Sequence, residues 1–600
     1  MRKNRVMLRA LRMYNAYNPK YFPLYLLQII FRNASFYFNL WMSAEIVTAL
    51  YEGRDQRELF ILVAAVLMGA FIIRAVAAGL DRAVITAQEI LENNEAAAFN
   101  QKTLSLDYDK IENPEVRQLR RKIDENKNIN YYGVINMRNS VQALMDDLVN
   151  LVFSGFLFVE MITGMAKVPF QGLGLILLIS LCACQALTIY FQFWENEKIA
   201  ASWDEIGSMM LQENQLSQGY RLNGMDSRIY LQQKHVSKWY RKFNEYHKKV
   251  YSKVYKKKFV LEIAPKAFAQ LTELLSYLII ICYCLLGAFP IGSIIKYVGY
   301  LERALGSIGD IFGTVGMCKS NERFLETYLS YFDIRNDMYQ GSLAVEKRSD
   351  KRFDIEFRNV SFRYAGSREY ALRNIDLSLK VGERLAVVGM NGSGKTTFIK
   401  LLCRLYDPTE GEIIMNDFNI RKYDYKQYLD IFSVVFQDYN LLAMPLGNNV
   451  ACAADWDGEK AERLLREVGF GDRYEELANG LETPIYKNFD TDGVEISGGE
   501  AQKIALARAL YRDAPFIILD EPTAALDPIA EAEIYSNFDR IVGDKTAIYI
   551  SHRLSSCRFC DKIAVFHEGR IVQLGTHEEL LQDAQGKYYE LWHAQAQYYT

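Results

Sequence analysis

The chain has 600 residues, of which 50% are hydrophobic and 24% are charged, and its formal net charge is -3 at pH 7. This length exceeds what a single hydrophobic core usually supports, so we expect at least two domains. The near balance of charge argues against a general nucleic-acid-binding protein. The nine cysteines follow no repeating pattern and several lie inside apolar runs, which favours buried free thiols over disulfides or a zinc site.

The first half of the chain is predicted to form an α-helical polytopic membrane domain. It holds about six segments with the roughly 20 apolar-rich residues that a bilayer crossing needs. Basic residues crowd the N-terminal segment and residues 234–258, which places both on the cytoplasmic side. We therefore expect a multi-pass protein of the cell membrane with cytoplasmic N- and C-termini. The apolar segments begin near Tyr21, Glu58, Tyr132, Leu173, Pro265 and Ile291.

Two long polar stretches, residues 94–130 and 196–258, keep a helical composition and are too long for simple loops. We expect them to be helices that continue from the membrane into the cytoplasm. Pro114 interrupts the first stretch, and the glycines of residues 219–224 punctuate the second. These interruptions indicate turning points with short transverse helices, and ordinary hairpin tips are the alternative.

Nine charged residues fall inside the expected spans, where each costs about 2.5 to 3.5 kcal/mol at mid-bilayer. They should therefore face the bundle interior or a water-filled path. Acidic groups outnumber basic ones, which fits a cavity for a polar or cationic cargo. Mutual pairing and snorkelling at the span ends are the alternative. The residues are Arg32, Glu45, Arg74, Asp146, Asp147, Glu160, Glu273, Lys296 and Glu302.

The second half has the shorter apolar runs of a soluble α/β domain. The polar residues 336–352 end in a basic cluster and are predicted to be a linker. We therefore expect a membrane domain with long cytoplasmic helical extensions at residues 1–335, and the soluble domain at residues 353–600.

Residues 389–397 have the spacing Gly-x-x-x-x-Gly-Lys-Ser/Thr, between an apolar strand and a helical pattern. Gly392 and Gly394 let the backbone approach phosphate oxygens, and the free N–H groups at the start of the helix point at them. Lys395 adds a positive charge, and Thr396 is left to hold Mg²⁺. The stretch therefore predicts a nucleotide phosphate cradle. Its binding residues are Gly389, Asn391, Gly392, Ser393, Gly394, Lys395, Thr396 and Thr397.

Several residues around the cradle suit the chemistry of phosphate transfer. Asp520 ends an apolar strand and is placed to hold Mg²⁺, and Glu521 follows it to orient or deprotonate the attacking water. His552 lies at the tip of another strand, fit to contact the γ-phosphate. Gln437 follows a third strand and can reach Mg²⁺ or water. Tyr364 offers a ring that can stack on adenine.

A second anion-binding turn precedes an Ala-rich helix. Its glycines and the N-terminus of the helix suit a phosphate group. One chain needs only one cradle, so we predict that this turn closes over the nucleotide held at Lys395 of a second chain. The residues of the turn are Ser497, Gly498, Gly499 and Glu500.

With these motifs in this order, the chain resembles an ABC transporter half-molecule of the exporter type over nearly all of its length. The resemblance implies a transmembrane domain of about six helices followed by an α/β P-loop ATPase domain. It assigns Tyr364 to adenine stacking, residues 389–397 to Walker A, Gln437 to the Q-loop and His552 to the switch histidine. It further assigns Ser497 to Glu500 to the signature, Asp520 to Walker B, Glu521 to the catalytic carboxylate and residues 525–527 to the D-loop. The transverse turns near Pro114 and Gly224 correspond to coupling helices that dock on the ATPase domains.

Two departures from the family pattern stand out. Glu500 replaces the usual glutamine of the signature, which adds a negative charge near the partner's nucleotide. Residues 490–495 lack the common Val-Gly-Glu-Arg-Gly form, which leaves the contact to the coupling helices open.

The resemblance implies an ATP hydrolase coupled to transport, with ATP and Mg²⁺ as cofactors and a second half-transporter as partner. A homodimer is favoured and a heterodimer is the alternative. Residues 391–395 and 527–531 are similar to lantibiotic-type peptide exporters, so we expect export of a peptide or other amphipathic molecule. Export of a lipid or drug, import, and a membrane ATPase that regulates without moving cargo are the alternatives.

Overall fold

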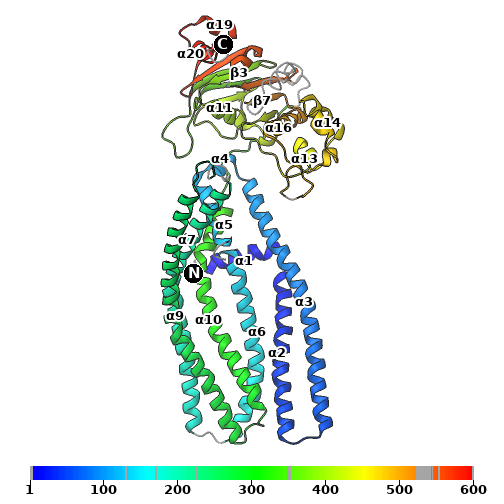
Figure 1. Cartoon of the computed structure of the whole chain (residues 1–600), viewed down its shortest axis with the longest axis vertical. Coiled ribbons are helices and arrows are strands. Elements are labelled where there is room, and N and C mark those ends of the chain that lie inside the picture. The colour runs from blue at the N-terminus through cyan, green and yellow to red at the C-terminus, as the bar shows by residue number, and fades with distance from the viewer. Residues whose placement is uncertain are drawn as a thin grey trace. The chain divides into compact units, whose positions relative to one another are not determined.

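The computed structural model describes residues 4–128, 132–168, 172–222, 228–346, 353–488, 490–521, 542–543, 545–551 and 554–596. The chain divides into two compact units (Figure 1). The first comprises Met1–Leu106 and Pro114–Arg335, and the second comprises Asp107–Asn113 and Asn336–Thr600.

The first unit is built from long helices. α2 packs against α3, α6 against α10, and α7 against α9, and Figure 1 shows these pairs running alongside one another. The helices are α1 Asn4–Tyr17, α2 Tyr21–Tyr51, α3 Gln56–Leu104, α5 Pro114–Asn128, α6 Val134–Met165, α7 Gly172–Leu222, α9 Gln233–Leu285 and α10 Ser293–Phe332.

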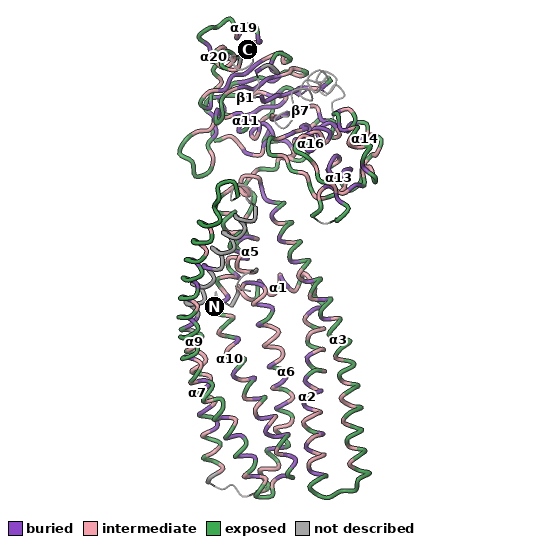
Figure 2. Tube along the Cα trace, viewed as in Figure 1, coloured by how far each residue is buried: buried purple, intermediate pink, exposed green. Residues whose placement is uncertain are grey.

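The helices of this unit expose apolar side chains, which a membrane domain requires. Figure 2 shows exposed residues along much of α3, and Phe60 and Phe71 on that helix are 79% and 72% exposed. Among the described residues, four helical segments are long and apolar enough to cross a membrane: α3, α6, α9 and Gly174–Asn196 of α7. α2 and α10 begin close to where the sequence predicts the first and last spans, but they are not in this set.

Pairing accounts for some of the charges that the sequence places inside the spans. Arg32 lies 2.7 Å from Asp146, and Lys296 lies 2.8 Å from Glu160. Arg74 is exposed on α3, contrary to the expectation that it faces the interior. Mutual pairing therefore explains four of the nine residues, and several of the remaining acids line cavities described below.

A short helix, α4 (Tyr108–Glu112), forms just before Pro114, where the sequence predicts a transverse helix, and α5 starts at Pro114 itself. α4 belongs to the second unit. Its Tyr108 ring packs edge-on against Tyr406 at 5.5 Å, and the Lys400 ammonium lies 5.4 Å from the centre of the same ring. The second predicted turn, near Gly224, lies largely outside the described residues.

The second unit contains two sheets. The smaller is antiparallel with strand order β2-β1-β4-β5, and the larger has the order β10-β9-β3-β8-β7-β6. In the larger sheet β9, β3, β8, β7 and β6 are parallel, and β10 pairs antiparallel with β9. The strands are β1 Ile355–Phe362, β2 Leu372–Leu379, β3 Arg384–Gly389, β4 Glu410–Met415, β5 Phe418–Asn419, β6 Phe432–Val435, β7 Phe516–Asp520, β8 Thr546–Ile550, β9 Lys562–His567 and β10 Arg570–Gly575.

Apolar residues cover both faces of the larger sheet. One core joins it to the smaller sheet and α11, and a second core joins its other face to α13, α14 and α16. Parallel strands end at the same edge of a sheet, where α/β proteins bind ligands. The helices are α11 Lys395–Leu402, α12 Tyr425–Leu429, α13 Leu446–Ala451, α14 Gly458–Glu467, α15 Gly471–Glu475, α16 Gly498–Arg512, α19 His577–Gln582 and α20 Lys587–Ala596.

Candidate functional site

The predicted cradle lies between β3 and α11, where the sequence places it. Gly394 precedes the helix in a left-handed conformation, with φ 104°. A Cβ atom there would lie 2.6 Å from a methyl group of Leu372, so both backbone and space require glycine. The first N–H groups of α11 are thereby left facing the loop, which suits an anion.

Lys395 is held against this loop. Its Nζ donates hydrogen bonds to the carbonyl oxygens of Gly389 at 2.9 Å and Met390 at 3.1 Å, and the residue is only 6% exposed. Burial lowers the pKa of Lys395, while the carboxylates of Glu521 and Asp520 act to raise it. The ammonium therefore stabilises the loop through hydrogen bonds, and the negative charges of Glu521 and Asp520 act on it.

The other cradle residues differ in how far they are exposed to solvent. Asn391, Gly392 and Thr396 are exposed. Ser393 is buried, and its Oγ has no hydrogen-bond partner among the residues that the structure describes. Buried polar atoms normally have a partner, so this hydroxyl suits a phosphate oxygen.

Tyr364 contacts the cradle through its hydroxyl group. That hydroxyl lies 2.9 Å from Oγ1 of the buried Thr397. The ring packs edge-on against Phe362 at 4.9 Å and Tyr406 at 5.5 Å. These contacts fix the ring beside α11, and its stacking on adenine stays a prediction.

The acidic pair predicted from the sequence lies at the end of β7, where Asp520 is the last residue of the strand and Glu521 follows it. Asp520 is 1% exposed, and its Oδ2 has no hydrogen-bond partner among the described residues. Burial, and then the charge of Glu521, raise the pKa of Asp520 to about 6. A buried carboxylate that has an oxygen without a hydrogen-bond partner and lies beside a second acid is suited to bind a cation.

Glu521 adopts a left-handed backbone conformation, with φ 51°. Its side-chain Oε2 accepts a hydrogen bond from Nε2 of Gln437 at 3.1 Å. Two residues that the sequence assigned to catalysis, 84 positions apart, are therefore in direct contact.

Gln502 is a site residue that the sequence reasoning missed. It is 3% exposed, and its Nε2 donates to the backbone carbonyl of Glu521 at 3.1 Å. This bond ties α16 to the turn that carries the predicted catalytic acid. The sequence feature that could have indicated Gln502 is a single amide side chain within the Ala-rich helix that follows the signature.

The signature turn caps α16. Oγ of Ser497 accepts a hydrogen bond from the backbone N–H of Glu500, and the Glu500 carboxylate accepts one from the backbone N–H of Ser497 at 2.7 Å. The guanidinium of Arg473 lies 3.1 Å from the same carboxylate. Burial acts to raise the pKa of Glu500, but the hydrogen bonds from Ser497 and the charge of Arg473 outweigh it, so the pKa is lowered. Glu500 thus has a local role that glutamine also fills in capping boxes.

We expect Glu500→Ala to lower the stability of the ATPase domain by about 1 kcal/mol, because it opens the capping box. For a domain of this size the melting temperature should fall by about 2–4 °C. Glu500→Gln should lose less stability, since the amide oxygen of glutamine can still accept the hydrogen bond from the backbone N–H of Ser497. Thermal unfolding of the full chain in detergent measures both variants, and equal melting temperatures for Ala and the unchanged chain would contradict the assignment.

Two predicted elements lie outside the described residues: His552 and the D-loop, residues 525–527.

The comparisons with known proteins agree with this geometry. Residues 372–524, which hold the cradle, Gln437, the signature and the acidic pair, match the family described as ABC transporter. The chain carries an ABC transporter domain. Its similarity extends to the "Subtilin transport ATP-binding protein SpaT" of Bacillus subtilis, with 34% identity over 55% of this chain and 54% of that protein. It also extends to the "ATP-dependent lipid A-core flippase" of Escherichia coli (strain K12), with 38% identity over 43% of each chain. Each match spans about half, or less, of the relative's length.

The fold of the whole chain matches a solved exporter. The "Structure of a bacterial Atm1-family ABC exporter with ATP bound" aligns with a TM-score of 0.70 and 20% identity, over 95% of this chain and 98% of that one. The predicted fold, a helical domain ahead of an α/β domain, is thereby confirmed. The match to the ABC transporter family implies that this domain binds a nucleotide.

Proposed function

We propose that this chain is half of an ATP-driven membrane transporter that exports its substrate by alternating access. The observation that carries the proposal is the contact between Gln437 and Glu521, beside Asp520 and at the edge of the sheet where the cradle lies. This contact supports a base at Glu521 near the cradle, which a domain that only binds nucleotide would not need. Closure of two ATPase domains around ATP would then be passed to the helices through elements such as α4.

The proposed substrate is a peptide or another amphipathic molecule. The name of the Bacillus subtilis relative supports the peptide, and the name of the Escherichia coli relative supports a lipid as the second candidate. Stimulation of ATP hydrolysis by amphipathic peptides, compared with lipids, in the purified chain reconstituted in lipid nanodiscs tests this choice. Substrate accumulation in inside-out vesicles supports export, whereas accumulation only in right-side-out vesicles would indicate import. ATP hydrolysis without transport in either orientation would indicate a regulatory ATPase.

We propose Mg²⁺ as the metal, held by Thr396, Gln437 and Asp520 together with the nucleotide phosphates. The unpartnered Oδ2 of Asp520 fits this role. Among the described residues, no group of three or more histidine, cysteine or acidic side chains could hold a metal by itself, and Mg²⁺ commonly binds through one or two carboxylates and substrate phosphates. When bound, Mg²⁺ neutralises charge that develops on the phosphates. Glu521 would orient or deprotonate the attacking water, and His552 would contact the γ-phosphate.

The pKa of Asp520 predicts a pH dependence of Mg²⁺ binding. Because that pKa is about 6, the carboxylate is ionised at pH 7.5 and largely protonated at pH 5. We expect the Mg²⁺-dependent part of ATP affinity to weaken about tenfold between these two pH values. Calorimetric titration with ATP, in the presence and in the absence of Mg²⁺, measures the Mg²⁺-dependent part of the affinity. Asp520→Asn should bind with little Mg²⁺ dependence at either pH, and an unchanged dependence in this variant would contradict the role of Asp520.

The proposed assembly is a homodimer, because every predicted catalytic position is present in this one sequence, and a heterodimer is the alternative. Ser497 and Gly498 of one copy would close over the nucleotide held at Lys395 of the other, with Gly499 and Glu500 shaping the turn. We propose that both termini are cytoplasmic, as the distribution of basic residues supports.

A further inference from the structure

Three adjoining cavities lie within the helical unit, bordered mainly by α6, α7, α9 and α10. Their volumes are about 440, 480 and 290 Å³. Asp310 lines all three, while Asp147 and Glu302 each line two of them. The cavities therefore meet around Asp310, and we call them together the acidic cavity.

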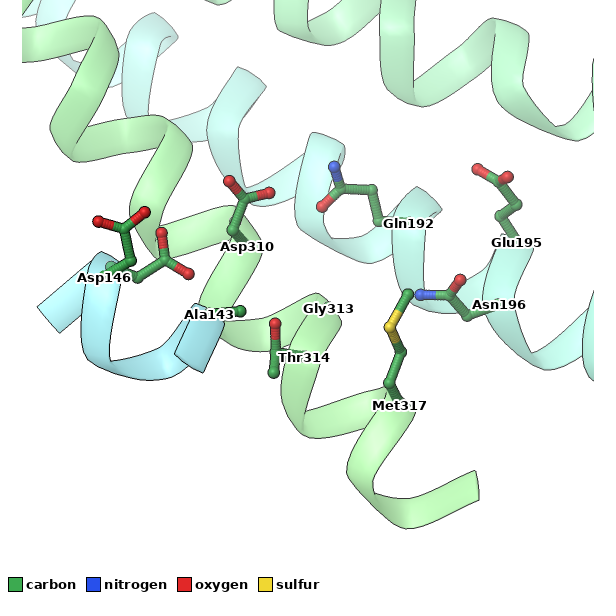
Figure 3. A pocket seen from close by; sticks show the side chains of 11 residues that line it. Ala143, Asp146, Gln192, Glu195, Asn196, Asp310, Gly313, Thr314 and Met317 are labelled. Carbon is green, nitrogen blue, oxygen red and sulfur yellow. The ribbon is translucent and has the colours of Figure 1, made fainter. Parts of the chain in front are cut away.

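The charge of the acidic cavity is strongly one-sided. Among the described residues that line it, only Arg303 is basic. Figure 3 shows the carboxylates of Asp146, Glu195 and Asp310 around one part of it, with the amide of Gln192 between them. The acidic lining residues are Asp146, Asp147, Glu195, Glu273, Glu302 and Asp310.

Pairing within the bundle satisfies only part of this charge. Asp146 lies 2.7 Å from Arg32 and accepts a hydrogen bond from Asn33. Asp310 and Glu302 form no ion pair with any described residue, and a buried oxygen of Glu302, Oε1, has no hydrogen-bond partner in the described part of the chain. Carboxylates left unpaired within membrane helices usually face a ligand or a water-filled path.

Thr314 gives an independent indication of a ligand. It is 9% exposed and lines the cavity one helical turn beyond Asp310. Threonines inside helices commonly bond the carbonyl of the preceding turn, as Thr272 and Thr188 do here. The Thr314 hydroxyl makes no hydrogen bond to any residue that the structure describes, and Figure 3 shows it directed toward the carboxylates of the cavity. A hydroxyl that opens to the cavity from an otherwise buried side chain, without a partner, suits a polar ligand.

The lining also includes an apolar section. Phe36, Leu40, Ile295 and Val298 border the same space as Asp147, Glu302 and Asp310. A molecule that fills both sections needs a positive group and an apolar body.

We infer that the acidic cavity binds the transported molecule through a positively charged group, an ammonium or guanidinium, near Asp310, Asp147 and Glu302. This inference rests on the proposed transport function and specifies its substrate as an amphipathic cation. Thr314 would accept a hydrogen bond from the same group, and the apolar section would hold the rest of the molecule.

The test compares probes of similar shape and different charge. The full chain in lipid nanodiscs is titrated with 4-phenylbutylammonium, a cation, with 4-phenylbutyrate, an anion of similar shape, and with neutral 4-phenylbutan-1-ol, and binding is measured by equilibrium dialysis. We expect saturable binding of the cation and at least about tenfold weaker binding of the other two. Asp310→Asn should weaken cation binding about tenfold, which corresponds to losing one charged contact. Thr314→Val, nearly identical in shape, tests the same site if Asp310→Asn folds poorly.

Glu326→Gln is the matched control, because Glu326 is an exposed acid on the same helix that does not line the cavity. Equal binding of cation and neutral probe, or unchanged cation binding in both Asp310→Asn and Thr314→Val, would overturn the inference. ATP hydrolysis is recorded in parallel: normal hydrolysis with no cation binding refutes the acidic cavity alone, whereas cation binding without hydrolysis refutes the proposed transporter.

Discussion

Glu521→Gln is expected to lower steady-state ATP hydrolysis about 10³-fold, within the usual contribution of a general base, while ATP still binds. Glutamine keeps the size of Glu521 and an oxygen that can accept the hydrogen bond from Gln437, but it cannot take a proton from water. The left-handed turn at residue 521 and the bond from Gln502 to its carbonyl involve only the backbone, so they should persist. Phosphate release and the amount of nucleotide retained after gel filtration measure the two effects.

Glu459→Gln is a suitable control for this variant, because Glu459 is an exposed acid of the same domain, in the first turn of α14. It should hydrolyse ATP like the unchanged chain. If Glu521→Gln also retained full hydrolysis, Glu521 would not be the base.

Lys395→Ala is expected to weaken ATP binding by about 2 kcal/mol or more, which is at least about 30-fold. Two effects act together. The variant loses the positive charge beside the phosphates, and it loses the two hydrogen bonds that hold the carbonyl groups of Gly389 and Met390. Titration with a fluorescent ATP analogue measures the affinity directly.

Lys380→Ala serves as the control for the loss of one positive charge, because Lys380 is exposed between β2 and β3. Its ATP affinity should stay within about twofold of the unchanged chain, as expected for an exposed charge. Undiminished binding in Lys395→Ala would contradict the cradle.

The cradle could be predicted from sequence because its geometry is local. Gly394 and Lys395 are neighbours, and the turn between strand and helix leaves few conformations for them. Asp520 was also predictable, because a carboxylate at the end of a buried parallel strand must lie at the ligand-binding edge.

Contacts between distant residues could not be predicted in the same way. The bond between Gln437 and Glu521 depends on β6 pairing with β7, and the bond from Gln502 depends on how α16 packs. The capping role of Glu500 was readable from its spacing to Ser497, but its pairing with Arg473 depends on the fold around α15.

In the helical domain, apolar runs predicted where five long helices begin, since length and hydropathy are properties of a single segment. The run from Pro265 lies inside α9, which begins at Gln233. The partners of charged residues were not predictable, because Arg32 and Asp146 are 114 positions apart on different helices. For the same reason the sequence left open which acids pair and which line a cavity.

Crosslinking between two copies tests the central claim most directly. In the proposed dimer, Ser497 of one copy approaches the cradle of the other, where Met390 is 55% exposed. A chain carrying Met390→Cys, Ser497→Cys and Glu521→Gln should form a disulfide-linked dimer under mild oxidation only when ATP is added, and the corresponding variants with a single introduced cysteine should not. Failure of ATP to increase this dimer, or a link formed within one chain, would contradict an ATP site shared between two copies.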